Sequence, residues 1–224
     1  MMAHIILASQ SPRRRELLRL CGYPFEATAA DVDENSVFDP DPAQDCILTA
    51  RLKAEAVLDN ISGSKQERVI IVAADTNVAL DDQILGKPKD ATDAKRMLSR
   101  LRGRTHDVHT GVVIIDVESG REVSGSHTAV VQMRNYTDQE MSAYVASGDP
   151  LDKAGAYAIQ HPVFQPVESL DGCYLGVMGL SICHLLQLFQ QIELPFLTDL
   201  TDLKRAHQEF YCPLYEQAAR KQGK

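Results

Sequence analysis

The sequence predicts an α/β protein built on one long mixed β-sheet that is flanked by helices. Over the first half of the chain, apolar runs typical of buried strands alternate with helical patterns, and this order is typical of parallel strands joined by helices. Residues 105–117 and 122–134 are then two β-rich runs joined by a short polar connection, which predicts a long antiparallel hairpin. The sequence contains no internal repeat, low-complexity tract or linker, so a single domain is expected.

The first elements are expected in residues 4–18, which predict a strand, a turn and the start of a helix. Ser11 is a favourable N-cap, Pro12 suits the first helical position, and Gly22 stops the helix. The three arginines at 13–15 are out of place, because a helix N-terminus already carries partial positive charge. A bound anion would reverse that cost, so the turn is a candidate phosphate site. The alternative is solvated surface charge, and for an isolated motif of this kind it is about equally common.

A helix and a buried strand follow an acidic segment. Residues 27–45 are expected to form a loop around a short strand, and residues 42–60 have the apolar spacing of a helix. Lys53 borders the apolar face of that helix, and the commoner interpretation is a buried stem with its ammonium in water. The unbroken β-favouring run at 69–74 predicts a strand buried on both faces. It ends at Asp75, where open α/β sheets place their ligands.

The middle of the chain is expected to contain a short strand and turn over residues 77–85, around the aspartates at 81 and 82, and then a helix capped at Asp90. Lys87 precedes that helix and could be a phosphate ligand or an ordinary loop lysine. When the residue is considered by itself, the ordinary loop lysine is favoured. His106 and His109 lie three positions apart on a strand, so they should point to opposite faces and share no metal.

The last third begins with a capping box at 137–140 that opens a helix. Residues 147–160 are mostly small and polar, and they should form a loop that runs into a short strand. Small side chains would let the backbone of this loop lie close to a ligand. Another strand is expected at 174–178, and a helix capped by Ser181 comes next. The tail at 198–224 is mostly helical in pattern, with a break at Pro213 and a frayed polar end.

The composition restricts the partners and the compartment. The chain has 224 residues and a formal net charge of −8, which argues against binding to nucleic acid polymers or to anionic membranes. No stretch approaches the ~18 apolar residues of a membrane-spanning helix, and the first strand is too short for a signal peptide, so a cytoplasmic location is expected. The five cysteines are scattered without a C-x-x-C pair, which indicates neither a disulfide framework nor a cysteine-rich zinc site.

Basic and acidic residues fall at the ends of the expected elements, where one cleft could gather them. This combination suits a polyphosphate with a divalent metal, because cations neutralise phosphate oxygens and carboxylates hold the metal or orient water. The P-loop, dinucleotide-binding and nucleophile-elbow motifs are absent, so a P-loop NTPase, a Rossmann enzyme and a serine hydrolase are not supported. The candidate residues are Arg13, Arg14, Lys53, Lys87, Lys153, Glu34 and Asp75.

Six short stretches occur in an order and spacing that characterise a known family. They are LASQSPRR at 7–14 with ELL at 16–18, DE at 33–34, KA at 53–54, ADT at 74–76, GKP at 86–88 and SGDPLDKAGAYAIQ at 147–160. Together they resemble the Maf-like family of nucleoside triphosphate pyrophosphatases, whose fold is related to that of the inosine triphosphate pyrophosphatases. The resemblance covers the chain from residue 4 to about residue 192.

The resemblance implies two lobes around a central nucleotide cleft and hydrolysis of a nucleoside triphosphate to the monophosphate and pyrophosphate, assisted by Mg²⁺ or Mn²⁺. Asp75 would activate water or hold the metal, and Glu34 would be a further polar or metal-linked group. The other substrate-binding residues that the resemblance implies are Ser9, Arg13, Arg14, Lys53, Thr76, Lys87 and Gln160.

The combination of Arg13, Thr76 and the Ile-Gln pair at 159–160 resembles the branch of the family that acts on dTTP and UTP. Two positions depart from the family pattern. His161-Pro162 replaces the usual glycine after Ile-Gln, beside the residue that would select the base, and Ser181 replaces a proline before the last helix. Arg15 has no counterpart in the motif and is expected to stay in solvent.

Two alternatives stay open at this point. The first is the same reaction on 7-methyl-GTP or another modified purine triphosphate. The second is a non-catalytic nucleotide-binding regulator of cell division, which the family's association with septum formation suggests. We expect residues 1–195 to form the nucleotide pyrophosphatase domain and residues 196–224 to form a helical extension packed on it. A homodimer is expected only because the family resemblance implies it.

Overall fold

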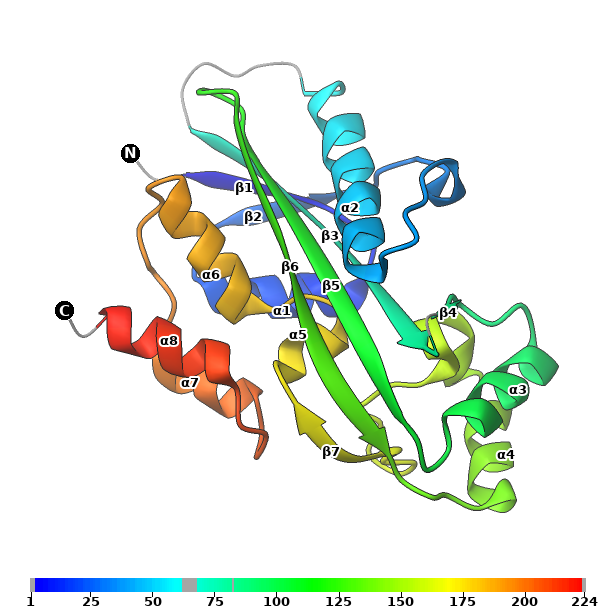
Figure 1. Ribbon diagram of the computed structural model, residues 1–224. Helices are drawn as coiled ribbons and strands as arrows, with labels where there is room; N and C mark the ends of the chain where they lie inside the picture. The colour runs from blue at the N-terminus through cyan, green and yellow to red at the C-terminus, as the bar shows by residue number, and fades with distance from the viewer. Residues whose placement is uncertain (1–2, 62–67, 82, 223–224) are drawn as a thin grey trace.

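The computed structural model confirms the mixed α/β class (Figure 1). It describes residues 3–61, 68–81 and 83–222, the side chains of 221 and 222 excepted. Seven strands form one sheet in the order β2-β1-β3-β5-β6-β7, and β4 pairs with the end of β3. Strands β2, β1 and β3 are parallel, and the other pairs are antiparallel. The strands are β1 (His4–Ala8), β2 (Phe25–Thr28), β3 (Val69–Leu80), β4 (Gln83–Leu85), β5 (Thr105–Asp116), β6 (Arg121–Met133) and β7 (Val167–Asp171).

Helices cover both faces of the sheet. Strand β3 alternates between them, with Ile71 and Ala73 in a small core under α2, and Ile70 and Val72 in the large core on the other face. Near one end of the β5–β6 hairpin lie α3, α4 and β4, whereas α2 and α6 lie toward the other end, which gives the two expected lobes (Figure 1). The helices are α1 (Pro12–Leu18), α2 (Pro42–Leu58), α3 (Ala91–Leu101), α4 (Asp138–Ala146), α5 (Tyr174–Met178), α6 (Ile182–Gln191), α7 (Leu200–Ala206) and α8 (Pro213–Gln222).

The local signals for helix ends are confirmed. The Ser11 hydroxyl accepts a hydrogen bond from the backbone N–H of Arg14 at 3.4 Å, and Gly22 ends the first helical segment with φ of 75°. The capping box of α4 is complete, and Ser181 caps α6 by accepting from the N–H of His184.

The two histidines of β5 have different surroundings. His106 hydrogen-bonds to Tyr157, and His109 hydrogen-bonds to Thr128.

Several expectations for strands are wrong. Residues 174–178 form the short helix α5, because a buried apolar run of this length looks like a strand when only its composition is considered. The segment before Gln160 is a turn without a strand. The tail is helical with a break, as expected, and the break lies between the end of α7 at Ala206 and Pro213, which begins α8. Strand β3 continues to Leu80, and Asp82, expected in the following turn, lies outside the described residues. Strand β7 was not expected, because its sequence VESLD lacks apolar alternation.

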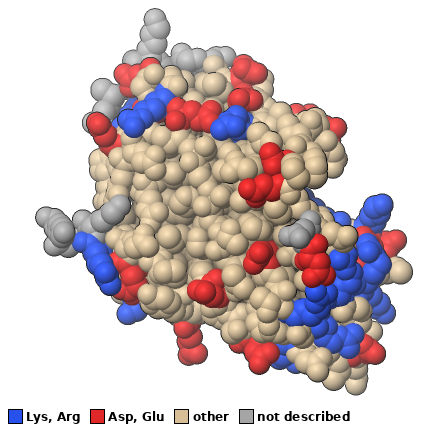
Figure 2. All heavy atoms as spheres, viewed as in Figure 1, with Lys and Arg blue, Asp and Glu red and all other residues tan. Residues whose placement is uncertain are grey.

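The charged side chains are distributed unevenly. Figure 2 shows Lys and Arg side chains gathered at the end of the molecule that carries α3. Many of these cations are paired, for example Arg102 with Asp138 at 2.7 Å and Arg104 with Asp81 at 2.6 Å, so much of that charge is neutralised. Within the described residues, no helix combines the length and the apolar composition that a membrane crossing requires.

Gly111 on β5 lets α2 lie close to the sheet, directly opposite Asp75 in the strand register. A Cβ at this position would lie 2.6 Å from the carbonyl carbon of Cys46 and 2.7 Å from the amide nitrogen of Ile47, both on α2. We expect Gly111→Ala to lower the free energy of unfolding in urea by about 1–3 kcal/mol, because the helix must shift. Gly86→Ala is the matched control, since a Cβ there meets nothing within 4 Å. Equal stability of the two variants would contradict this account of the packing.

Burial of His106 predicts a stability that depends on pH. Its ring is 3% exposed, and burial lowers its pKa from 6.5 to about 4. As the pH falls, His106 therefore takes up a proton in the unfolded chain before it does so in the folded one. The free energy of unfolding should fall by up to about 3 kcal/mol between pH 6.5 and pH 4. Urea unfolding across this range should show a shallower pH dependence for His106→Gln than for the unsubstituted chain. Identical slopes would contradict the burial effect.

Candidate active site

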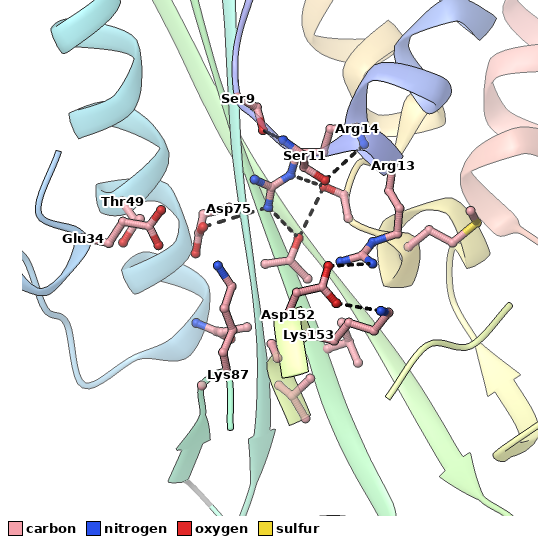
Figure 3. A pocket seen from close by; sticks show the side chains of 18 of the residues that line it. Ser9, Ser11, Arg13, Arg14, Glu34, Thr49, Asp75, Lys87, Asp152 and Lys153 are labelled. Carbon is pink, nitrogen blue, oxygen red and sulfur yellow. Dashed lines mark hydrogen bonds and ion pairs between the residues drawn. The ribbon is translucent and has the colours of Figure 1, made fainter. Parts of the chain in front are cut away.

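The site lies at a gap in the edge of the sheet. Strand β1 pairs with β3 only as far as Val72, and β4 pairs with β3 only from Val78 onward. On that side, no strand of the described residues pairs with residues 73–77 of β3, while on the other side Asp75 pairs with Gly111 of β5. A pocket of about 850 Å³ opens at the gap (Figure 3). Strand order changes at this point, which is where open α/β sheets bind ligands.

Lys53 holds two carboxylates on one side of the pocket. Its Nζ lies 2.7 Å from Oδ1 of Asp75 and 2.9 Å from Oε1 of Glu34. The Lys53 side chain is only 7% exposed, because α2 packs through small residues such as Ala50 and Ala54 against the face of the sheet that carries Asp75. The expectation of an ammonium group in water is therefore wrong, since the two partners come from other parts of the chain.

Arg14 faces Asp75 from the opposite side of the pocket. Its Nε donates a hydrogen bond to the carbonyl of Gly179 at 2.9 Å, and its Nη2 lies 3.4 Å from Oγ1 of Thr76. The same Nη2 is 3.9 Å from Oδ1 of Asp75. The side chain of Thr76 also lies 3.1 Å from the hydroxyl of Thr110. These contacts fix the guanidinium of Arg14 in the pocket, so the misplaced helix-terminal charge has partners even without an anion.

Arg13 and Arg15 point in different directions. Arg13 lines the pocket and lies 3.6 Å from Oδ2 of Asp152, a long ion pair at a half-exposed position. Arg15 is exposed and donates to the carbonyl of Gln10. Lys153 is buried and already bound, with Nζ 2.7 Å from Oδ1 of Asp152 and 2.9 Å from Asp149. Figure 3 shows Arg13, Asp152 and Lys153 side by side at the pocket. Arg13 is therefore the freer of the pocket cations on this side.

The other expected residues also line the pocket. Ser9 is buried, and its hydroxyl accepts from the N–H of Ser11. Lys87 points into the pocket (Figure 3), and within the described part of the chain it has no ion-pair partner. Gln160 contributes to the pocket lining from the turn after the buried Ile159. His161 beside it accepts from the N–H of Phe164, which makes the departure from the family pattern part of a turn.

Three groups that contribute to the site were not predicted. Asp152 pairs with Arg13, and the carbonyl of Gly179 orients Arg14. Asn77 is buried at the pocket and donates to the carbonyl of Pro42, while its own Oδ1 has no partner within the described residues. The sequence offered a signal only for Asp152, which lies inside the small and polar stretch at 147–160. A backbone carbonyl gives no sequence signal.

A mixed sheet with a pocket at its edge gap, lined by several cations around a carboxylate pair, defines a site for a polyanion. The model of the Maf-like protein family matches residues 4–192. The chain therefore belongs to the Maf-like family.

Several curated relatives are about two-fifths identical to this chain. A dTTP/UTP pyrophosphatase of Geotalea uraniireducens is 40% identical over 85% of this chain and 95% of its own. Proteins of the same name from Acetivibrio thermocellus and Bacillus cytotoxicus are also 40% identical, over 84% and 86% of this chain and 95% and 97% of their own.

Two solved structures align less well. The Ham1 protein of Staphylococcus aureus aligns over 85% of this chain and 99% of its own, with a TM-score of 0.43 and 12% identity. A dITP/XTP pyrophosphatase of Mycobacterium abscessus aligns over 59% of this chain and 73% of its own, with a TM-score of 0.38 and 16% identity.

Proposed function

We propose that this protein hydrolyses nucleoside triphosphates, dTTP and UTP above all, to the monophosphate and pyrophosphate. The observation that carries the proposal is the arrangement of cations around Asp75 in one pocket at the edge gap of the sheet. The printed name of the curated relatives, dTTP/UTP pyrophosphatase, supports the same reaction. The activity would remove triphosphates from the nucleotide pool, and that role predicts a cytoplasmic protein.

In this proposal the cations hold the phosphate chain. Arg14 is already fixed by the carbonyl of Gly179, so it can present its remaining N–H groups without a large entropic cost. Arg13 and Lys87 have weak or no ion pairs among the described residues, so both are free to turn toward a phosphate. Ser9, in the turn before α1, would add a hydroxyl donor beside the helix N-terminus.

Asp75 is the proposed general base. Every contact that the structure gives its carboxylate goes to Oδ1, from Lys53 at 2.7 Å and Arg14 at 3.9 Å, within the described residues. The carboxylate is thus held in one orientation while Oδ2 stays available to accept a proton from water. Thr76, which follows Asp75 on β3, would fix Arg14 on the other face of the strand.

The donor set also fits a divalent metal. Asp75 and Glu34 contact the same ammonium, so both carboxylates face one small region that also receives phosphate oxygens in the proposal. Mg²⁺ and Mn²⁺ favour such sites, made of one or two carboxylates with substrate phosphates. When bound, the ion would neutralise charge on the phosphates. We propose Asp75 and Glu34 as the residues that hold it.

The choice of base is assigned to Gln160. A thymine or uracil ring presents a carbonyl oxygen and an N–H along one edge, and a primary amide can donate to the first and accept from the second. Gln160 lines the same pocket as the phosphate-binding cations. A panel of triphosphates at equal concentration, with Mg²⁺ or Mn²⁺, tests this assignment. Preference for dTTP and UTP is expected, and preference for 7-methyl-GTP or tight binding without turnover would overturn it.

The different directions of Arg13 and Arg15 give a matched comparison on one helix. We expect Arg13→Ala to lower kcat/KM for dTTP by about ten- to a hundredfold, since it removes a charged contact to phosphate worth about 1.5–3 kcal/mol. Arg15→Ala should stay within about twofold of the unsubstituted enzyme, because Arg15 lies outside the pocket lining. Steady-state kinetics of the two variants check this expectation. Equal losses of kcat/KM would contradict the proposal that Arg13, and not Arg15, contacts the phosphates.

The division of the chain and its oligomeric state stay predictions. We propose residues 1–195 as the nucleotide pyrophosphatase domain and residues 196–224 as an extension packed on it. A homodimer is proposed from the family resemblance, and sedimentation equilibrium tests it.

A further inference from the structure

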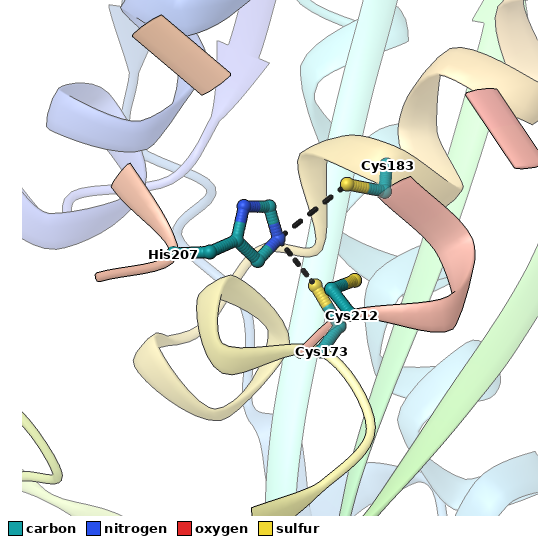
Figure 4. A group of neighbouring side chains, drawn as sticks. All are labelled: Cys173, Cys183, His207 and Cys212. Carbon is teal, nitrogen blue, oxygen red and sulfur yellow. Dashed lines mark hydrogen bonds between the residues drawn. The ribbon is translucent and has the colours of Figure 1, made fainter. Parts of the chain in front are cut away.

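Four buried side chains with metal-binding atoms meet outside the pocket lining: Cys173, Cys183, His207 and Cys212 (Figure 4). We refer to them as the Cys3His cluster. Each is 0–4% exposed, and none of them lines the active-site pocket. Their ligand atoms all lie within 4.8 Å of one another. We propose that the Cys3His cluster binds one structural zinc ion.

The spacing of the atoms fits tetrahedral zinc. Nε2 of His207 lies 3.5 Å from the sulfur of Cys183 and 3.6 Å from that of Cys173. With Zn–S bonds of about 2.3 Å and Zn–N bonds of about 2.0 Å, tetrahedral geometry separates a nitrogen and a sulfur by about 3.5 Å and two sulfurs by about 3.8 Å. The upper limit of 4.8 Å on the distances between ligand atoms exceeds the ideal sulfur–sulfur distance by about 1 Å. Side-chain rotation can supply a shift of that size.

The hydrogen bonds around the cluster orient the ligands toward its centre. Nδ1 of His207 lies 2.7 Å from the carbonyl oxygen of Leu203, which can only accept, so Nδ1 carries the proton and Nε2 presents its lone pair to the sulfurs. The N–H of Tyr215 points at the sulfur of Cys212 at 3.4 Å, and the hydroxyl of Ser181 donates to the sulfur of Cys173 at 3.2 Å. Donors of this kind stabilise metal-bound thiolates.

A buried cysteine alone is usually a small apolar side chain, and Cys21 and Cys46 fit that description. The Cys3His cluster differs because three sulfurs and one imidazole nitrogen all lie within 4.8 Å of one another. Three thiolates and one imidazole are the donors of structural zinc sites, and hard ions such as Mg²⁺ prefer oxygen. All four positions are supplied by the protein, so the site has no open position for catalysis.

The location indicates what the ion does. Cys173 and Cys183 come from the part of the chain that matches the family model, at the start of α5 and in α6. His207 and Cys212 come from the extension beyond residue 195, after α7 and before α8. The zinc ion therefore cross-links the C-terminal extension to the domain. The sequence alone did not indicate this site, because its five cysteines are scattered without a C-x-x-C pair.

Metal analysis of the full-length protein tests the proposal directly. Protein made without a histidine tag and purified without chelators should contain about one zinc ion per chain by mass spectrometry. Cys212→Ser should contain less than about a tenth of that amount, whereas Cys21→Ser, a substitution of a buried cysteine outside the cluster, should keep it. Equal zinc in Cys212→Ser and the unsubstituted protein would overturn the proposal.

A second measurement does not depend on the folding of a variant. The unsubstituted protein, freed of metal and reloaded with Co²⁺, should show the intense visible absorption of a tetrahedral ion with thiolate ligands, and Zn²⁺ should displace it at one equivalent. Thermal unfolding should shift to higher temperature on reloading with Zn²⁺ but not with Mg²⁺. Protein that takes up neither Co²⁺ nor Zn²⁺ and keeps all five thiols reactive after unfolding would refute the zinc site.

Discussion

Asp75→Asn should lose turnover while it still binds nucleotide. The amide keeps the shape of the carboxylate but cannot take a proton from water, and general-base catalysis contributes about 10²- to 10⁴-fold to such reactions. We expect kcat for dTTP to fall by about 10³-fold. Binding of a non-hydrolysable triphosphate should stay within a few-fold, because the substitution removes a negative charge next to the phosphates and leaves Arg13, Arg14 and Lys87 in place. Stopped reactions and calorimetric titration measure the two quantities.

Asp81→Asn is the control for Asp75→Asn. Asp81 is an exposed aspartate near the end of β3, and its ion pair with Arg104 lies outside the pocket lining, so kcat should stay within about twofold. Full activity of Asp75→Asn would remove Asp75 from the mechanism. Loss of nucleotide binding together with turnover would instead assign it to substrate binding alone.

Lys53→Met should have the second largest effect. The substitution keeps a long apolar stem in the packing of α2 but leaves Asp75 and Glu34 without the cation they share. Arg14 remains 3.9 Å from Asp75 but offsets the lost ammonium only in part. The two carboxylates therefore repel each other and the incoming phosphates more strongly, and we expect kcat/KM for dTTP to fall by about a hundredfold. The concentration of Mg²⁺ that gives half-maximal activity should fall at the same time, because the carboxylates gain one unit of uncompensated negative charge.

Lys89→Met is the matched control, since Lys89 is an exposed lysine outside the pocket lining and its loss should leave kinetics and metal dependence unchanged. The double variant Asp75→Asn with Lys53→Met should lose less than the product of the two single losses, because the two side chains are in contact at 2.7 Å. Additive losses in free energy would contradict a coupled pair, and an unchanged Mg²⁺ dependence would contradict the charge argument.

Local chemistry made much of the fold predictable. Residues 70–74 of the apolar run are buried on both faces of the sheet, and Asp75 follows them where β3 changes its pairing partner. The cap at Ser11 and the capping box at Thr137 act within a few residues, so they can be recognised without tertiary contacts. The separation of pocket arginines from Arg15 followed from the resemblance of residues 7–14 to the family motif.

The features that the sequence did not predict depend on contacts between distant segments. Lys53 resembles a snorkelling residue on its own helix, and its burial depends on Asp75, which is 22 positions away. The run at 174–178 is short and apolar, so neither length nor period separates helix from strand, and its helical form becomes evident only with the turn at Gly179. The Cys3His cluster has ligands on separate elements, and their convergence requires the packing of α7 and α8 on the domain.

The identity of the first products tests the proposed reaction most directly. Initial-rate hydrolysis of dTTP with Mg²⁺, separated by anion-exchange chromatography, should give thymidine monophosphate and pyrophosphate in equal amounts from the earliest time points. Release of orthophosphate with the nucleoside diphosphate as the first products would contradict cleavage between the α and β phosphates and, with it, the proposed function of the pocket around Asp75.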